Sequence, residues 1–383
     1  MSAEKGRAGS EPEILRPAAP EDCDAGSGTF LQTGFWGAFK SEFGWKPLHF
    51  VNEDTGIPLL VLERNLARGF SFAYIPRGPG PEVSGSADTE DLRKISEALR
   101  PRLSRSCVFL RMDLPWYMED ADAPRGIRAS TAPEPGEVSV STGSISKPPE
   151  PKPPFLRARA DVQPPDTVVL DLRGASDEDL LSRMKPKWRY NIKYSEKKGV
   201  VVDSETGPEG VAAFYSLYRT TARRDRIALH PEGYYRRLLS LAKEYGPGAP
   251  DIRVWIARYR GEPLAAIITS FLRGEAVYLY GASGDEHRNL MPAYALQWAA
   301  IRAARDEGCG RYDLFGIPPS DDPGHPMAGL YRFKTGFGGR IRRYAGSWDY
   351  PLRRPLYSAY RVAEGLRTYW YKRAKKRLGS FGR

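Results

Sequence analysis

A proline-rich stretch between two apolar-patterned regions constrains the fold of this chain more than any other feature. From residue 119 to residue 165 the sequence is rich in Pro, Ser and Glu, and it includes the run 147–154, in which Pro predominates. Such a composition buries little surface, and a packed domain rarely contains so long a loop. We therefore interpret residues 119–166 as an insertion or linker. Residues 1–28, rich in Pro, Gly, Ala and Glu, are predicted to be disordered.

The region before this stretch alternates short β-like runs with one amphipathic segment. Leu92, Ile95 and Leu99 recur at helical spacing, which predicts a helix over 89–103. The last strand of the region is expected to end at Asp113, which precedes Leu-Pro. Strands are predicted at 48–51, 58–63, 70–75 and 106–112.

The region after the stretch has a longer but similar pattern. Dipeptides of Arg and Gly at 260–261 and 273–274 are typical of tight turns between antiparallel strands. The predicted elements are a strand at 167–172, helices at 208–223 and 230–244, three strands at 252–259, 263–272 and 276–280, a helix at 291–307 and a strand at 310–315. A helix, three strands, a helix and a strand form the core of GNAT-type acyltransferases.

The predicted fold class is therefore mixed α/β (α+β), with two GNAT-like acyltransferase domains in tandem. The first domain is expected to comprise residues 29–118 together with 347–383, and the second residues 167–346.

Charge and composition exclude several classes of protein. The net charge is +11, and the segment 353–383 carries ten Lys or Arg against one acid, so the basicity is local. The three cysteines and four histidines form no metal-ligand pattern, and no metal is expected. No apolar run is long enough to span a bilayer, and the N-terminus lacks the apolar core of a signal peptide. We expect a cytoplasmic protein.

The junction between the third strand and the long helix argues against coenzyme A. GNAT enzymes bind the CoA phosphates there with a glycine-rich loop. In this chain the junction, residues 280–292, does not have glycines at the spacing of that loop. No CoA or other cofactor is predicted, so the acyl donor is expected to be of another kind.

Several segments, in order along most of the chain, resemble the Fem (FemABX) family of peptidoglycan aminoacyltransferases. The resemblance does not include residues 1–28 or the proline-rich insertion. Because the chain passes quickly from Tyr194 to the strand at Val200, it resembles the compact members that lack a coiled-coil arm. The matching segments are 167–172, 184–193, 197–200, 278–283, 292–298, 312–316 and, most distinctively, 329–339.

The resemblance implies a reaction and its catalytic residues. An amine of the peptidoglycan stem peptide would attack the ester carbonyl of aminoacyl-tRNA, which serves as co-substrate. Lys334 would be the cation beside the resulting oxyanion, and Phe333 would shape the site. Asp113 would orient the attacking amine or accept its proton. The alternatives are a solvated helix lysine at Lys334 and a turn-capping aspartate at Asp113.

The resemblance also implies residues that bind the precursor. Lys40, in the segment that begins at Trp36, matches a lysine that contacts the precursor phosphates, and the alternative is a surface lysine with no such contact. Tyr234 and Tyr280 resemble tyrosines that line the precursor groove, although both could belong to the core. His230 lies where the family has a phosphate-binding arginine, and an arginine among residues 223–226 could replace it.

Two basic segments are expected to contact anionic partners. In the helix near residue 190, Lys187, Arg189 and Lys193 could bind tRNA phosphates, unless they form a solvated face. The segment 353–378 is a basic amphipathic helix. That helix could pack on the first domain and also contact tRNA or the cytoplasmic membrane as a peripheral anchor.

The predicted function is transfer of a small amino acid (Gly, Ala or Ser) from aminoacyl-tRNA to the stem-peptide amine of a UDP- or lipid-linked peptidoglycan precursor. The amino acid donated, the diamino acid that accepts it and the oligomeric state are left open by the sequence. One alternative is a GNAT-fold acyltransferase that acts on a different amine. The other is a non-catalytic RNA- or membrane-binding protein.

Overall fold

The computed structural model describes residues 14–26, 28–67, 69–84, 88–120 and 150–380. The chain forms two compact units. Unit 1 comprises residues 1–116, 149–163 and 345–383, and unit 2 comprises residues 117–148 and 164–344. The strands β6 (Cys107–Glu119) and β14 (Arg340–Pro351) contribute residues to both units. Within the described residues, no helix has the length and apolar character needed to cross a membrane.

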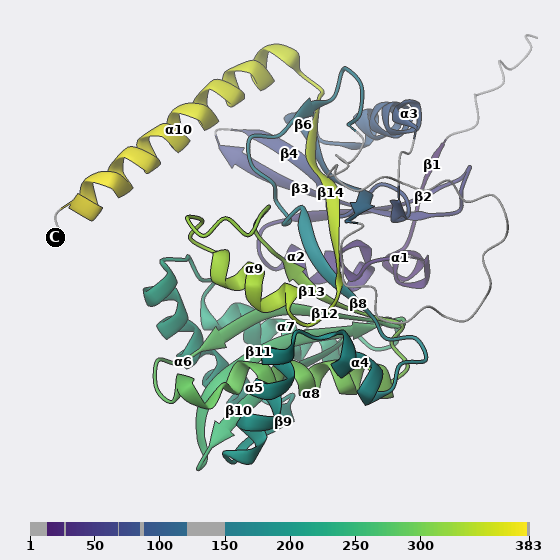
Figure 1. Ribbon diagram of the computed structural model, residues 1–383. Coiled ribbons are helices and arrows are strands. Elements are labelled where there is room, and N and C mark those ends of the chain that lie inside the picture. The colour runs from purple at the N-terminus through teal and green to yellow at the C-terminus, as the bar shows by residue number, and fades with distance from the viewer. Residues whose placement is uncertain (1–13, 27, 68, 85–87, 121–149, 381–383) are drawn as a thin grey trace, which may run out of the picture. The chain divides into compact units, whose positions relative to one another are not determined.

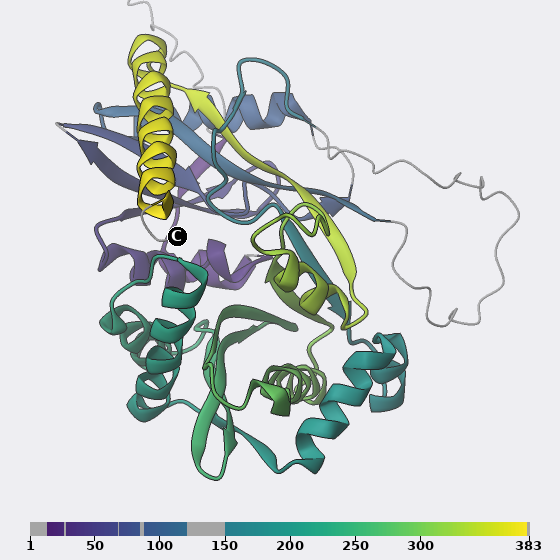
Figure 2. The same ribbon diagram turned by 60° about the vertical axis from the view of Figure 1, so that its left-hand side comes forward.

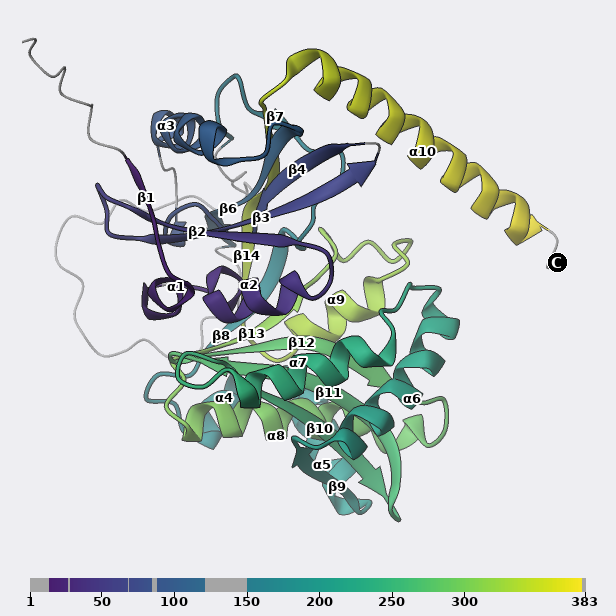
Figure 3. The same ribbon diagram turned by 180° about the vertical axis from the view of Figure 1, so that it is seen from behind.

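Unit 1 is built on a sheet with the strand order β1-β2-β3-β4-β6-β14, and β7 pairs with β14. The helices α1 and α2 lie along β2 and β3 (Figure 3). The other elements are β1 (Leu15–Pro17), α1 (Pro20–Gly26), η1 (Phe30–Gln32), α2 (Gly34–Ser41), β2 (Lys46–Asn52), β3 (Pro58–Ala67), β4 (Phe70–Ile75), β5 (Val83–Ser84), α3 (Thr89–Leu99), η2 (Arg100–Arg102), β7 (Leu156–Arg157) and α10 (Arg354–Ser380).

Unit 2 is built on the order β8-β13-β12-β11-β10-β9, with residues 340–343 of β14 next to β8. Helices α6 and α7 lie on one side of this sheet and α5 and α8 on the other (Figure 2). The elements are β8 (Asp166–Asp171), α4 (Asp177–Arg183), α5 (Pro186–Lys197), β9 (Val200–Glu205), α6 (Pro208–Asp225), α7 (Glu232–Glu244), β10 (Asp251–Tyr259), β11 (Glu262–Leu272), β12 (Glu275–Ser283), η3 (Arg288–Leu290), α8 (Pro292–Asp306), β13 (Arg311–Gly316) and α9 (Ala328–Thr335).

The two units repeat one arrangement. In unit 1 the antiparallel strands β2, β3 and β4 are followed by α3 and then by β6, which lies parallel to β4. In unit 2 the antiparallel strands β10, β11 and β12 are followed by α8 and then by β13, which lies parallel to β12. A helical crossover is what a parallel pair requires. The predicted mixed α/β class is confirmed, and the order of elements predicted for the second region is present.

The core of unit 2 follows from the alternation of side chains along its strands. Trp255 and Ala257 of β10 pack with Trp188 of α5 and Ile301 of α8 in one apolar cluster. Because successive residues of a strand point to opposite faces, the intervening residues of β10 face the side where α6 and α7 lie. Only Lys198 and Gly199 separate α5 from β9, so this connection holds no coiled-coil arm, as predicted.

The prediction of disorder over residues 1–28 is wrong for the part that the structure describes. Leu15 and Cys23 are fully buried, and β1 pairs with β2 through Leu15 and Asn52. Two apolar side chains therefore anchor a segment whose average composition is that of a disordered chain. Residues 1–13 lie outside the described residues.

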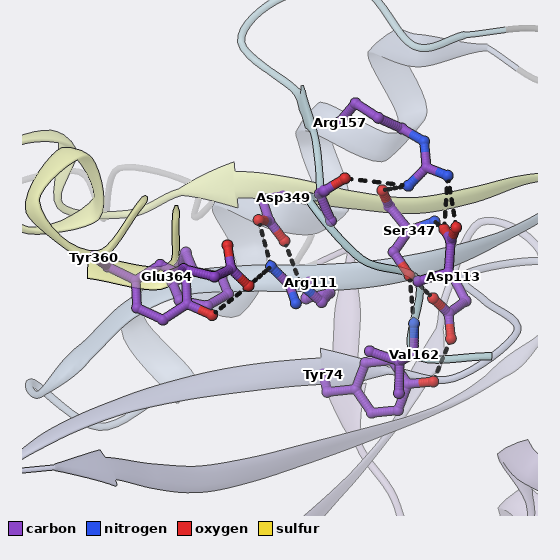
Figure 4. A network of polar contacts seen from close by, with 12 residues as sticks. Tyr74, Arg111, Asp113, Arg157, Val162, Ser347, Asp349, Tyr360 and Glu364 are labelled. Carbon is purple, nitrogen blue, oxygen red and sulfur yellow. Dashed lines mark hydrogen bonds and ion pairs between the residues drawn. The ribbon is translucent and has the colours of Figure 1, made fainter. Parts of the chain in front are cut away.

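The prediction that residues 119–166 form a linker is also wrong in part. Phe155 is buried in the core of unit 1. Arg157 donates a hydrogen bond of 2.8 Å to the Ser347 carbonyl, and Asp161 accepts one of 2.7 Å from the Ser347 amide (Figure 4). These contacts hold residues 150–163 against β14. Residues 121–149 of the predicted linker lie outside the described residues.

The strand expected to end at Asp113 in fact continues to Glu119. Pro115 therefore lies inside β6, although proline has no amide hydrogen to donate. The pairing of β6 with β4 extends only to Met112, so the missing donor interrupts no bond on that side.

A buried ion pair joins β6 to β14 and α10 within unit 1. Arg111 donates two hydrogen bonds of 2.7 and 2.8 Å to the Asp349 carboxylate, and the Tyr357 hydroxyl donates a third of 2.9 Å (Figure 4). The Tyr360 hydroxyl donates to Glu364, whose carboxylate lies 3.9 Å from Arg111. The first turns of α10 are thereby anchored, and its second half extends away from the strands (Figure 1).

Removal of the Arg111 charge should destabilise unit 1. Arg111→Met would leave the Asp349 carboxylate buried without its cation, which typically costs about 3 to 5 kcal/mol. Hydrogen exchange of peptides from β6 and α10, followed by mass spectrometry, should become about a hundredfold faster or more. The matched control Arg93→Met, which breaks two exposed ion pairs on α3, should leave these rates unchanged. Equal rates in Arg111→Met and the wild type would contradict the assigned role of the pair.

Candidate functional site

Lys334 is a buried lysine in α9 of unit 2. The residue is only 5% exposed, and its Nζ donates a hydrogen bond of 2.8 Å to the Gly316 carbonyl. The same Nζ lies 4.9 Å from the centroid of the Tyr278 ring. The alternative of a solvated helix lysine is therefore wrong. Among the described residues no other hydrogen-bond acceptor for this Nζ is found, and an ammonium group has three hydrogens to donate.

The carbonyl that holds Lys334 is presented by an unusual turn at the end of β13. Phe315 has φ of +60°, a conformation that costs energy for a bulky residue. The turn is held by Asp313, which accepts a hydrogen bond of 2.7 Å from the Phe315 amide and another from the Thr167 hydroxyl. Backbone strain of this kind is found where the surrounding structure maintains a functional geometry.

Burial controls the charge of Lys334. Loss of hydration lowers the pKa of its ammonium group from 10.5 to about 7, and the Asp313 carboxylate opposes this shift only in part. Near neutral pH the side chain is therefore present both as ammonium and as amine. In either form it can donate a hydrogen bond, and as ammonium it can stabilise a developing negative charge.

The backbone around Lys334 is held by Trp188 of α5. The Trp188 Nε1 donates a hydrogen bond of 2.9 Å to the Phe333 carbonyl. A Cβ atom on Gly336 would lie only 2.1 Å from the Trp188 ring, so the close packing of α5 on α9 requires glycine there. The Phe333 ring packs edge-on against Tyr294 and Phe337. These contacts give a physical reason for the Phe-Lys-x-Gly-Phe pattern of residues 333–337.

Three of the predicted substrate-binding residues lie together in unit 2. The His230 ring stacks on Tyr234 with centroids 4.1 Å apart, and Tyr234 hydrogen-bonds to Tyr280. Burial raises the pKa of Tyr234 to about 12, so the hydroxyl remains neutral. Tyr280 lies two residues from Tyr278, the residue beneath the Lys334 ammonium. A β-bulge separates these two tyrosines, so the tyrosine cluster and Tyr278 lie on opposite faces of β12.

Sequence reasoning did not assign a role to Tyr278, although the residue lies in one of the matching segments. Its hydroxyl occupies the space beside Gly281, where a Cβ atom would approach it to 1.7 Å. In a regular strand, residues two apart share a face, and this spacing would place Tyr278 beside Tyr280. The structure differs, because Tyr278 pairs with Thr269 and Tyr280 with the adjacent Ile268, so a β-bulge turns the two rings to opposite faces. The sequence carries no signal for this bulge or for the Gly316 carbonyl.

A second group of predicted residues lies in unit 1. The Lys40 Nζ is 5.3 Å from the Trp36 ring and 5.8 Å from the Trp45 ring, and the Arg64 guanidinium is 5.2 Å from the Trp45 ring. Burial, and then the positive charge of Arg64, lower the pKa of Lys40 to about 8. Two cations beside the same indole ring favour the binding of an anion, because an anion offsets their repulsion. Sequence reasoning did not find Arg64 or Trp45.

Asp113 lies apart from this group, inside β6. It is 2% exposed, and its carboxylate accepts hydrogen bonds from the Tyr74 and Ser347 hydroxyls and, at 3.2 Å, from the Gln163 amide (Figure 4). Burial raises the pKa of this carboxyl despite these donors. These contacts tie three segments of unit 1 together. The contact with substrate implied for Asp113 stays a prediction, and none of these bonds supports it.

The residues predicted to contact tRNA do not share one environment. Lys187 and Lys193 are exposed on α5. The Arg189 guanidinium instead donates a hydrogen bond of 2.6 Å to the Met184 carbonyl, where it caps the end of α4. The described residues contain no cluster of three or more His, Cys, Asp or Glu side chains that could hold a metal ion.

The pKa of Lys334 can be measured directly. In lysine-labelled protein, with Lys334→Met used for assignment, the NMR signal of this side chain should titrate near pH 7. Because the unfolded chain keeps that proton to about pH 10, folding stability should rise between about pH 7 and 10 in the wild type, and less so in Lys334→Met. Titration near pH 10.4 would contradict the burial of the ammonium group.

Comparisons with known proteins identify the family that this chain resembles. The FemAB family model matches residues 24–247 and 254–365. Lipid II:glycine glycyltransferase of Staphylococcus saprophyticus is 23% identical over 86% of this chain and 90% of its own length. The protein of the same name from Staphylococcus aureus is 33% identical over 51% of this chain and 61% of its own length.

The fold agrees with these matches. The crystal structure of FemX superposes with a TM-score of 0.70 at 17% identity, over 90% of this chain and 99% of that protein. The family model spans nearly all of both units, including the segment of Lys334. The chain belongs to the FemAB family.

Proposed function

We propose that this protein transfers a small amino acid from aminoacyl-tRNA to the stem-peptide amine of a lipid-linked peptidoglycan precursor. The observation that carries the proposal is the buried Lys334 ammonium, held by the Gly316 carbonyl over Tyr278. Acyl transfer is accelerated by a fixed hydrogen-bond donor or positive charge at the place where the carbonyl oxygen of the substrate becomes negative. Membership of the FemAB family supports this chemistry.

The chemistry of the step follows from the proposed substrates. The neutral amine of the stem peptide attacks the ester carbonyl, and a carbon–nitrogen bond forms. The carbonyl oxygen then carries the negative charge beside Lys334, and collapse of this intermediate breaks the ester bond. The terminal hydroxyl of the tRNA leaves with the proton that the amine loses. No cofactor enters this reaction, and the donor is not acetyl-CoA.

The names of the relatives support a lipid-linked acceptor. Two staphylococcal relatives act as lipid II:glycine glycyltransferases. We propose lipid II rather than a UDP-linked precursor as the acceptor and glycine as the first donor to test, with alanine and serine as the other small candidates. The choice of tRNA as the carrier rests on the resemblance of the sequence and on the chemistry above.

The precursor diphosphate is proposed to contact Lys40 and Arg64 of unit 1. These side chains flank Trp45, and the charge of Arg64, together with burial, lowers the pKa of Lys40. A dianion would relieve their mutual repulsion. The tyrosines Tyr234 and Tyr280, with His230, are proposed to contact the precursor on unit 2.

A lipid-linked acceptor also gives α10 a role at the membrane surface. Val362 and Leu366, one helical turn apart, are 62% and 55% exposed. Arg361 directly precedes Val362, and Arg367 directly follows Leu366. An exposed apolar stripe with flanking arginines favours an anionic lipid surface. Peripheral contact through the segment 353–378 is therefore part of the proposal.

Loss of the Lys334 charge should abolish most of the transfer. With glycyl-tRNA and lipid II, Lys334→Ala should lower kcat by about 10²- to 10³-fold, because one stabilising donor to the oxyanion is removed. Lys243→Ala, at an exposed lysine of α7, serves as the matched control and should keep wild-type activity. Radiolabelled transfer to the lipid is the measurement. Full activity in Lys334→Ala, or no transfer by the folded wild type from any of the three donors, would contradict the proposal.

Loss of the Lys40 charge should weaken precursor binding instead of the chemical step. Lys40→Ala should raise KM for lipid II about tenfold while kcat changes little, because the contact is present both before and in the transition state. The matched control is Lys46→Ala, an exposed lysine of β2. An unchanged KM in Lys40→Ala would exclude this residue from the phosphate site.

A further inference from the structure

We infer that the outer face of α5 is an RNA-binding surface on which Tyr190 stacks with an unpaired base while Lys187, Lys193 and Lys197 contact the phosphates. This inference rests on the proposed function, because it takes the RNA to be the carrier of the donated amino acid. Beyond that function, the inference names α5 as the element that binds the RNA and Tyr190 as the residue that stacks on its single-stranded end.

The geometry of α5 places these side chains together. Tyr190 is 64% exposed, and its ring stacks on Tyr194 with centroids 5.8 Å apart and planes at 22°. At 100° per residue, Lys187, Lys193 and Lys197 lie within about 60° of Tyr190 around the helix. Aromatic rings among lysines form the usual platform for single-stranded nucleic acid.

The lysines of this face are available for a partner. No ion pair or hydrogen bond to another described residue is found for Lys187, Lys193 or Lys197. Between residues 185 and 198 the chain carries six Lys or Arg and one acid, Glu196. Arg189, another of these six, donates to the carbonyl at the end of α4 and does not belong to the surface. A concentrated, unpaired positive charge attracts a polyanion.

The inner face of the same helix contacts the residues of the candidate site. Trp188 is buried, and its Nε1 binds the carbonyl of Phe333, the neighbour of Lys334. The Lys185 amide, just before the helix, donates a hydrogen bond of 2.9 Å to the Gly336 carbonyl. RNA bound on α5 would therefore lie on a helix that packs directly against α9.

The composition of the face favours RNA over a lipid surface. Membrane-bound helices insert Leu, Val or Phe between their basic residues. On α5 the exposed large apolar side chain is Tyr190, and the aliphatic residue Ile192 is buried in the core. Tyrosine can stack on a base and hydrogen-bond through its hydroxyl, but it offers little aliphatic surface for insertion.

The test uses the full chain and a fluorescent, deacylated glycine tRNA whose binding is followed by anisotropy. Tyr190→Ala should weaken binding at least fivefold, because a stacked base typically contributes that much or more. Tyr190→Phe should bind within twofold of the wild type, since the ring is kept. The matched control is Val201→Ala, which removes an exposed apolar side chain of β9 in the same unit and should bind as the wild type does.

The lysines are tested through salt dependence. Lys187→Gln and Lys193→Gln should each reduce the slope of log affinity against log salt by about one, whereas Lys243→Gln should leave it unchanged. In the transfer assay, Tyr190→Ala should raise KM for glycyl-tRNA and leave KM for lipid II as it is.

The outcomes separate the two proposals. A wild type that transfers glycine, with Tyr190→Ala matching it in tRNA affinity and KM, would overturn the inference and leave the proposed function intact. A folded wild type that transfers nothing and binds no tRNA would show the failure of the proposed function itself. If Tyr190→Ala loses binding to vesicles of phosphatidylglycerol and phosphatidylcholine but keeps tRNA affinity, the face is a membrane contact and the inference is wrong.

Discussion

The candidate site depends on one interaction, the hydrogen bond between the Lys334 ammonium and the Gly316 carbonyl. It holds a positive charge in a place where hydration is lost and where the pKa of that charge falls to about 7. A charge in such surroundings interacts more strongly with a developing oxyanion than one in water. The strained turn at Phe315 and the packing of Trp188 on α9 both maintain this geometry.

The repeated arrangement of the two units explains how the site residues are positioned. In unit 2 the crossover through α8 brings β13 beside β12, so the carbonyl at the end of β13 and the rings of Tyr278 and Tyr280 belong to neighbouring strands. Unit 1 uses the same crossover through α3, and there the two strands carry the polar network around Asp113 and Arg111 instead of a candidate catalytic lysine. One topology therefore carries the candidate site in unit 2 and a stabilising polar network in unit 1.

The sequence predicted the elements of unit 2 well because the hydrophobic period, the Arg-Gly turns and the proline at the start of α8 are local signals. It also led to Lys334 and Lys40 through motif resemblance. It could not reveal that Asp113 binds Ser347, since partners 234 residues apart leave no local pattern. Average composition was misleading at residues 150–163, where Phe155 and a few polar contacts outweigh the prolines. The role of Arg189 as a cap depends on the position of α4, which no spacing in the sequence indicates.

The central claim is that Lys334 recognises the charge of the transition state. The most direct measurement compares two RNA-linked analogues of the aminoacyl end, an anionic tetrahedral phosphonate and a neutral amide. The wild type should bind the phosphonate more tightly than the amide, and Lys334→Met should lose this preference while it binds the amide as before. If Lys334→Met still prefers the phosphonate to the same degree, the buried ammonium does not stabilise the oxyanion and the account fails.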